Sequence, residues 1–178
     1  FGMSKGLIVQ KYGGSSVGSV ARIHAVAAQV AKLAGEGYQV AVVVSAMGDS
    51  TDRLIELARE VCPDPDAREL DALLATGEMV STALLAIAIK KCGRAARSYN
   101  ALQLPIATTG PAGRARIKSV ECAALKQDLA AGTVVSTWPL SSPLWGGDRE
   151  QPKRGGILRV RGWDPVHFDP QLTRNFKT

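Results

Sequence analysis

The chain has few of the residues that form disulfides, membrane spans or aromatic clusters. Only 5% of its 178 residues are aromatic, and its three cysteines, Cys62, Cys92 and Cys122, are odd in number and widely spaced. Such spacing predicts neither a disulfide framework nor a metal site, and it is typical of thiols in a reducing compartment. No apolar run approaches the roughly 18 residues of a membrane span. Residues 1–10 lack the apolar core of a signal peptide, so we expect a cytoplasmic protein without a membrane partner.

Positive charge is in excess, but it is unevenly distributed. The formal net charge is +6, and residues 133–178 hold seven Lys or Arg residues against four acidic ones. Half of the excess therefore comes from about a quarter of the chain. The rest is nearly balanced, which is typical of a metabolic enzyme, and we do not expect nucleic acid as a partner.

Hydrophobic periodicity predicts strands that alternate with helices over residues 7–137. That alternation predicts a layered α/β sheet with right-handed crossovers. The predicted strands cover residues 7–12, 40–44, 94–100 and 133–137. The predicted helices run from a Ser19 cap to Ala34, from Thr51 or Asp52 to Pro63, over residues 67–75, from Met79 to Lys91 after a cap at Thr76, and from a Ser119 cap to Ala131.

The character of the sequence changes at about Trp138. All three tryptophans and five of the nine prolines lie from there on, and no helical or strand periodicity persists. We therefore predict one domain over residues 1–137 and a divergent tail over residues 138–178. The tail is interpreted either as a frameshifted, recombined or disordered end or as a natural divergent one.

The most informative segment is Lys11–Gly18, which begins at the end of the first predicted strand. A lysine closes the strand, Gly13 and Gly14 follow after one residue, and two serines precede a helix. Glycines let backbone N–H groups approach an anion without a Cβ in the way, and a helix N-terminus adds partial positive charge. The order predicts a phosphate site, although its spacing is neither that of the Walker A motif nor that of the dinucleotide fingerprint.

Three blocks in one order resemble aspartate kinases, which belong to the amino-acid kinase superfamily. They are Lys11–Gly18, Val42–Asp52 and Leu74–Ser81, and a looser similarity ends near Gly132. The resemblance implies a three-layer α/β/α sandwich with a mostly parallel open sheet, here truncated. It also implies ATP-dependent phosphorylation of the L-aspartate side-chain carboxylate to 4-phospho-L-aspartate, the first step of lysine, methionine and threonine biosynthesis.

The resemblance also implies roles for individual residues. Lys11 matches the catalytic charge partner of the transferred phosphoryl group, and Ser45, Thr51 and Glu78 match residues that contact the aspartate substrate. ATP and Mg²⁺ are the implied cofactors, with no metal site on the protein itself. The implied ATP- and phosphate-binding residues are Lys11, Tyr12, Gly13, Gly14, Ser15 and Ser16.

The same residues also suit structural roles. Ser45 suits a turn and Thr51 a helix cap, and Glu78, placed in the first turn of a predicted helix, is stabilised there by the helix dipole. The two histidines, His24 and His167, look structural or solvent-facing.

Several parts of the family pattern have no clear match in this chain. They are the Gly-Arg-Gly-Gly-Ser-Asp block, the adenine-binding segment and the C-terminal regulatory ACT domains, so whether the chain phosphorylates aspartate by itself stays open. One alternative is another amino-acid kinase, acting on glutamate, acetylglutamate or carbamate. Another is a non-catalytic remnant whose basic, tryptophan-bearing tail binds nucleic acid. An uncovered sheet edge predicts homo-oligomerisation or self-association.

Overall fold

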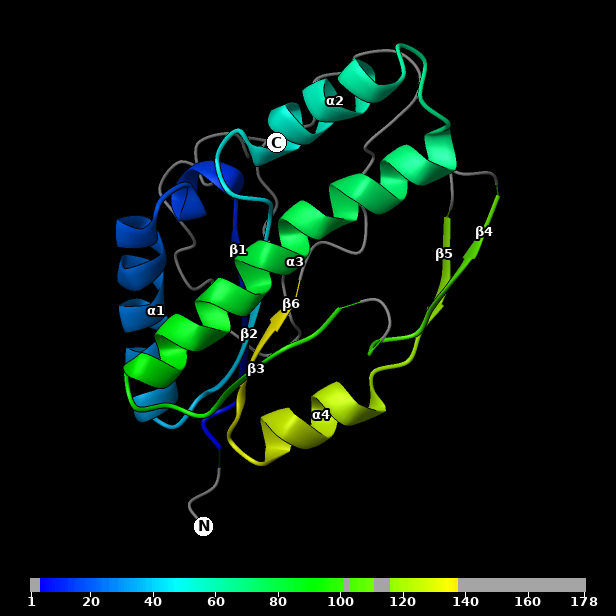
Figure 1. Cartoon of the computed structure of the whole chain (residues 1–178). Coiled ribbons are helices and arrows are strands. Elements are labelled where there is room, and N and C mark those ends of the chain that lie inside the picture. Colours follow the sequence, from blue (N-terminus) through cyan, green and yellow to red (C-terminus); the bar gives the residue numbers. More distant parts are fainter. Residues whose placement is uncertain (1–3, 101–102, 111–115, 138–178) are drawn as a thin grey trace, which may run out of the picture. The chain divides into compact units, whose positions relative to one another are not determined.

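A sheet of four parallel strands organises the part of the chain that the structure describes, residues 4–100, 103–110 and 116–137 (Figure 1). In this computed structural model the strand order is β1-β2-β6-β3, so β6 lies between β2 and β3. The register pairs Lys11 with Val43 and Val42 with Ser136. The strands are β1 (Leu7–Tyr12), β2 (Gln39–Val44), β3 (Ala96–Ser98) and β6 (Val134–Thr137).

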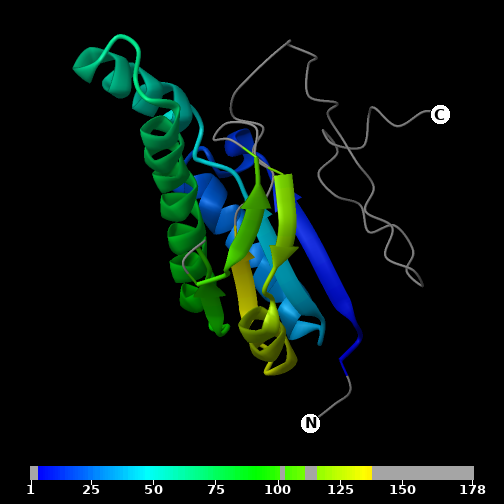
Figure 2. The same ribbon diagram turned by 90° about the vertical axis from the view of Figure 1, so that its right-hand side faces the viewer.

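Helices cover both faces of this sheet, which confirms the predicted three-layer α/β/α architecture. On one face, α1 (Val20–Gly35) and α3 (Ala67–Lys91) pack over β-branched side chains such as Val40 and Val42. On the other face, α4 (Ala123–Ala130) packs over Ala41 and Val135 (Figure 2). Neighbouring strand residues face opposite layers because side chains alternate along a strand. The continuous apolar run of β2 therefore fits a strand covered on both sides.

The first two helices begin close to where the sequence predicts them. The Ser19 hydroxyl accepts a hydrogen bond from the Arg22 backbone N–H at 3.3 Å, which confirms the predicted cap of α1. The second helix, α2 (Ser50–Val61), begins one residue before the predicted start at Thr51, and Asp49 occupies its N-cap position. Thr51 is therefore a residue inside the first turn and does not cap the helix.

One continuous helix, α3, stands where two helices are predicted between residues 67 and 91. The predicted cap at Thr76 is wrong, because the Thr76 hydroxyl donates to the Leu73 carbonyl at 2.7 Å within the helix. The Thr-Gly pair suggests a break, but buried side chains on both halves hold the helix together despite the glycine. The actual cap is Asp66, whose carboxylate accepts from the backbone N–H groups of Arg68 and Glu69.

A separate antiparallel pair of strands, β4 (Ile106–Thr109) and β5 (Arg116–Val120), precedes α4. The predicted helix start at Ser119 is therefore wrong, because Ser119 lies in β5 and pairs with Ala107. The helix begins instead at Ala123. β-Branched residues in β5 favour the extended backbone, and pairing with β4 makes this segment a strand instead of the predicted helix start.

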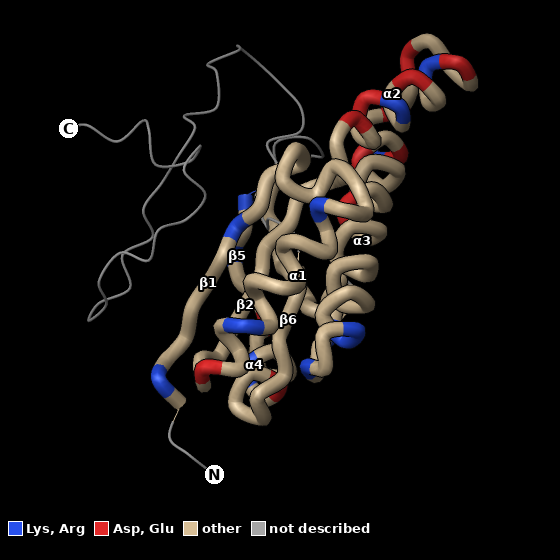
Figure 3. The backbone as a smooth tube through the Cα atoms, turned by 90° about the vertical axis from the view of Figure 1, so that its left-hand side faces the viewer, with Lys and Arg blue, Asp and Glu red and all other residues tan. Residues whose placement is uncertain are grey.

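Charge and hydropathy of the helices differ along the chain. Both signs of charge alternate along α2 (Figure 3). By length and composition alone, α3 qualifies as a helix able to cross a membrane, with a mean hydropathy of 1.8 over its most apolar window. Half of that window is buried inside the structure. All described residues belong to one compact unit, Phe1–Trp145, and the tail predicted over residues 138–178 lies outside the described residues.

Candidate functional site

The loops that follow β1 and β2 are joined to each other at the carboxyl ends of these strands. The Ser45 backbone N–H donates to the Tyr12 carbonyl at 3.1 Å, and the Gly48 N–H donates to the Gly14 carbonyl at the same distance. In open parallel sheets, ligands bind at this edge. Two of the three sequence blocks therefore form one surface where a ligand site is expected.

The glycines of the first block permit this close approach. A Cβ on Gly14 would stand 2.7 Å from the Ala46 carbonyl oxygen, a contact that real Cβ atoms do not make. Gly14 also opens a short 3₁₀ turn, Gly14–Val17, in which the Ser16 N–H donates to the Gly13 carbonyl at 2.9 Å. Gly48 adopts φ +51°, a backbone conformation that side chains disfavour. The loop geometry thus depends on glycine at two facing positions.

The third block reaches the same corner from α3. A Cβ on Gly77 would stand 3.2 Å from the Ala46 Cβ and 3.5 Å from Leu54 Cδ1. The lack of a side chain at Gly77 therefore lets α3 approach both the loop after β2 and the helix α2. Ala46 lies between Gly14 and Gly77, so the three blocks that are separated in sequence meet around one alanine.

Glu78, which follows Gly77, is buried in the interior of α3, with 8% of its surface exposed. It lies twelve residues into the helix that begins at Ala67, so the predicted placement in a first turn is wrong and the helix dipole does not account for it. One helical turn later, the Thr82 carbonyl accepts a hydrogen bond from Ser136 near the end of β6. Since α3 rises about 6 Å over four residues, Glu78 lies close to the level at which the strands end.

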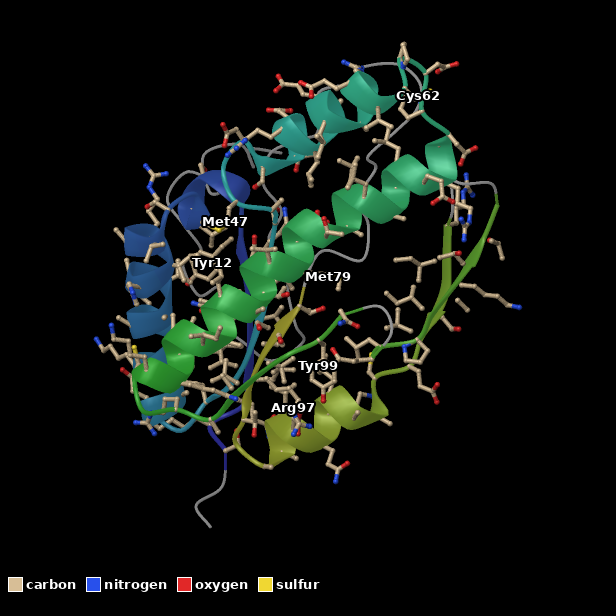
Figure 4. All side chains as sticks on the ribbon, in the orientation of Figure 1. Tyr12, Met47, Cys62, Met79, Arg97 and Tyr99 are labelled. Carbon is tan, nitrogen blue, oxygen red and sulfur yellow. The ribbon has the colours of Figure 1, made fainter. Side chains whose placement is uncertain are left out.

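Lys11 and Tyr12 project from opposite faces of β1. Lys11 is exposed, on the same face as Val9, which packs in the cluster beneath α4. Tyr12 is buried in the core under α1 and α3, near Met47 (Figure 4), and its hydroxyl donates to Gln10 Oε1 at 3.2 Å. Of this pair, only Lys11 offers its side chain to a ligand. Gly13 has no heavy atom of the described chain within 4 Å of its Cβ position, so the space beside the loop is open.

The two candidate substrate-binding residues of the second block, Ser45 and Thr51, are half-buried. Ser45 directly follows β2, and Thr51 lies in the first turn of α2. Both elements flank the loop that contacts Gly14 and Gly77, so both hydroxyls border the same corner. In the first block, Ser15 is exposed and Ser16 is half-buried. His24 is exposed on α1, as expected, and His167 lies outside the described residues.

Three features of this region were missed in the sequence. The Arg22 guanidinium donates to the Ser15 carbonyl and so holds the glycine loop from α1. Ser136 donates to α3, as described above. A groove of about 660 Å³ runs between α2 and α3, where Met47, Leu54, Leu57 and Val80 line it together with Arg53 and Glu56, and Gly18 and Gly77 of the first and third blocks also line it. No sequence motif marks these features. The Arg22 contact depends on an exposed side chain, and the Ser136 bond and the groove bring together residues that are distant in the chain.

Comparisons with known proteins identify the family of the chain. The chain matches the model of the Amino acid kinase family over residues 6–146. It is 50% identical over 129 residues to an aspartokinase of Mycobacterium bovis, and this aligned region covers 72% of this chain and 31% of that protein. The chain thus spans about a third of the length of the curated relatives that it matches.

Two solved structures are similar to this fold. The aspartate kinase of Synechocystis aligns with a TM-score of 0.65 and 42% identity, covering 74% of this chain and 21% of that chain. Aspartokinase III of E. coli, in complex with aspartate and ADP, aligns with a TM-score of 0.62 over 74% of this chain and 40% of that chain. At 19% identity the second likeness concerns the fold alone. The family match, the strand-edge site and the three converging blocks agree, and the chain belongs to the amino acid kinase family.

Proposed function

We propose that this chain supplies the substrate-binding lobe of an aspartate kinase, which transfers a phosphoryl group from ATP to the side-chain carboxylate of L-aspartate. The observation that carries the proposal is the meeting of the three blocks around Ala46, with Gly14 on one side and Gly77 on the other. The aspartokinase relatives at about 50% identity support the same activity.

Different residues of the proposed site bind the two ligands, ATP and L-aspartate. Phosphoryl transfer needs the reacting groups held together and their negative charge neutralised. Lys11, exposed at the end of β1, is the charge partner of the phosphoryl group, and the open loop at Gly13 lets backbone N–H groups approach phosphate oxygens. ATP supplies the phosphoryl group, and Mg²⁺ is expected to arrive with the nucleotide.

The aspartate substrate is placed on the α3 side of the same corner. Glu78 carries a carboxylate suited to the substrate ammonium group, and Ser45 and Thr51 carry hydroxyls suited to its carboxylates. The E. coli aspartokinase III structure, which has a similar fold, contains aspartate and ADP. The product, 4-phospho-L-aspartate, would enter lysine, methionine and threonine biosynthesis in the cytoplasm.

Self-association belongs to the same proposal. In the described sheet, β1 and β3 are the outer strands, and each pairs on one side only. Leu7 on β1 is partly exposed. Strand edges of this kind pair readily with further chain, so we expect a homo-oligomer or pairing with additional polypeptide.

The test is binding and turnover by the purified chain with L-aspartate, MgATP and a panel of other amino acids. We expect L-aspartate to bind and MgATP to bind through its phosphates at the glycine loop, with weaker binding of MgATP in Lys11→Ala. Preference for glutamate, acetylglutamate or carbamate would assign a different amino-acid kinase. Salt-dependent binding of oligonucleotides, without either kinase ligand, would instead favour the nucleic-acid alternative.

A further inference from the structure

A buried hydrogen bond ties the centre of α3 to the sheet. The Ser136 hydroxyl donates to the Thr82 carbonyl at 3.0 Å, and the two residues are only 1% and 2% exposed. A helix carbonyl already accepts from the amide four residues later, so this contact is an additional bond. It fixes the depth at which α3 lies on β6 more narrowly than apolar packing does, because a hydrogen bond is directional.

Ser136 occupies a central place in the sheet. β6 pairs with β2 through Val42 and with β3 through Ser98, so Ser136 is flanked by strands on both sides. Two residues earlier, Val134 packs into the core beneath α1 and α3, and strand alternation puts Ser136 on the same face. The hydroxyl is thus presented to α3 by a strand that has little freedom to move.

The hydrogen bond from Ser136 reaches α3 one helical turn away from Glu78. In an α-helix the amide of residue 82 bonds the carbonyl of residue 78, so Thr82, whose own carbonyl accepts from Ser136, lies one turn after Glu78 along the same side of the helix. On either side of Glu78, the Ser81 hydroxyl donates to the Gly77 carbonyl at 3.2 Å and the Thr82 hydroxyl donates to the Met79 carbonyl at 2.9 Å. With Gly77 against Ala46, the helix is held on both sides of Glu78.

We propose that Ser136 is a positioning residue for Glu78: its bond to the Thr82 carbonyl sets the depth and rotation of α3, and hence the place of the carboxylate that receives the substrate ammonium group. The inference rests on the proposed aspartate site. It predicts that loss of the hydroxyl weakens the binding of aspartate and leaves the binding of nucleotide at the glycine loop unchanged. A role in stability alone predicts no such difference between the two ligands.

The test compares Ser136→Ala with Ser98→Ala in the full chain. Ser98 is the register partner of Ser136 in β3, is half-buried, and makes no hydrogen bond to α3 among those that the described residues show, so it is a matched control. Calorimetric titration measures L-aspartate and MgATP separately. We expect about a three- to tenfold weaker aspartate affinity in Ser136→Ala, the effect of one hydrogen bond, with MgATP affinity unchanged and Ser98→Ala like the wild type.

The remaining outcomes separate this inference from the proposed function. Equal aspartate affinity in Ser136→Ala and the wild type, or a parallel loss for both ligands, would overturn the positioning role and leave the aspartate site intact. A folded wild type that binds no aspartate would overturn both. Ser136→Thr keeps the hydroxyl and should restore aspartate affinity. Hydrogen exchange supports the role if amides of residues 78–86 exchange faster in Ser136→Ala than in Ser98→Ala, and contradicts it if they do not.

Discussion

Gly77 lies directly against Ala46: a Cβ on the glycine would stand 3.2 Å from the Cβ of the alanine. One residue is in the interior of α3 and the other follows β2. Their contact sets how closely the helix that carries Glu78 approaches the loop between Ser45 and Thr51. The substrate side of the proposed site therefore depends on a position with no side chain.

The first prediction concerns Gly77→Ala. The added methyl must displace Ala46 or Leu54 by a few tenths of an ångström, which costs free energy, whereas alanine gains about 1 kcal/mol of helix propensity over glycine. The two effects oppose each other, so we expect the free energy of unfolding to change by less than about 1 kcal/mol. Aspartate affinity should fall nonetheless, because α3 is pushed away from the loop. Urea unfolding and calorimetric titration measure the two quantities, and unchanged aspartate affinity would contradict the coupling.

The second prediction compares two neighbouring glycines. Gly14→Ala places a methyl 2.7 Å from the Ala46 carbonyl, so backbone must move, and we expect a destabilisation of about 1–3 kcal/mol. Gly13→Ala meets nothing within 4 Å and has φ −75°, which alanine adopts readily, so its free energy of unfolding should stay close to that of the wild type. Thermal unfolding of both variants decides the matter. Equal destabilisation would show that the loop is not packed on Ala46 as described.

The third prediction concerns Glu78→Gln. The amide keeps the shape of the side chain but lacks the charge that pairs with the substrate ammonium group. A hydrogen bond to a charged group contributes about 1.5–3 kcal/mol, so aspartate affinity should fall by about ten- to a hundredfold. Glu69→Gln, an exposed residue in the first turn of the same helix, is the control and should bind aspartate normally. Normal binding by Glu78→Gln would remove this residue from the site.

The fourth prediction concerns pH dependence away from the site. The hydroxyl of the buried residue Tyr99 donates to Asp128 Oδ2 at 2.6 Å, and Arg97 pairs with the same carboxylate at 3.1 Å. Burial, and then the bond to Asp128, raise the pKa of Tyr99 above its ordinary value of 10.0. The folded chain thus holds this proton more tightly than the unfolded chain. The corresponding stabilisation is present below about pH 10 and is lost as the pH rises through the raised pKa.

Tyr99→Phe isolates that contribution. We expect the free energy of unfolding of the wild type to fall more steeply than that of the variant above about pH 10. At neutral pH the variant should be less stable by about 1–3 kcal/mol, because a partly buried hydrogen bond to a carboxylate is lost. Urea unfolding at a series of pH values measures both effects, and parallel pH profiles would show that the tyrosine proton does not contribute.

Much of the fold is predictable from local patterns in the sequence. The strand Leu7–Tyr12, the Ser19 cap and the β-branched run of β2 each carry a signal within a few residues. The single helix α3 is not predictable in this way, because a Thr-Gly pair resembles a helix boundary and only tertiary packing on both halves keeps it continuous. The predicted helix cap at Ser119 was wrong for a related reason, because the extended backbone of Ser119 depends on pairing with β4.

The site also has a part that local sequence predicts and a part that only tertiary contacts form. Lys11 and the adjacent glycines are recognisable because the phosphate loop is contiguous in sequence. The packing of Gly14 and Gly77 around Ala46, and the bond from Ser136 to Thr82, join residues that are 31 to 54 positions apart. Contacts at such separations leave no local pattern in one sequence. They become visible only when the strands are placed side by side.

The measurement that tests the account most directly is a titration of the ¹⁵N-labelled chain with L-aspartate, followed by amide chemical shifts. Binding at the proposed site predicts shifts confined to residues around Ser45, Thr51 and Glu78, with D-aspartate and L-glutamate producing weaker effects. Shifts that are absent in the folded protein, or that map elsewhere, would contradict an aspartate site formed where the three sequence blocks meet.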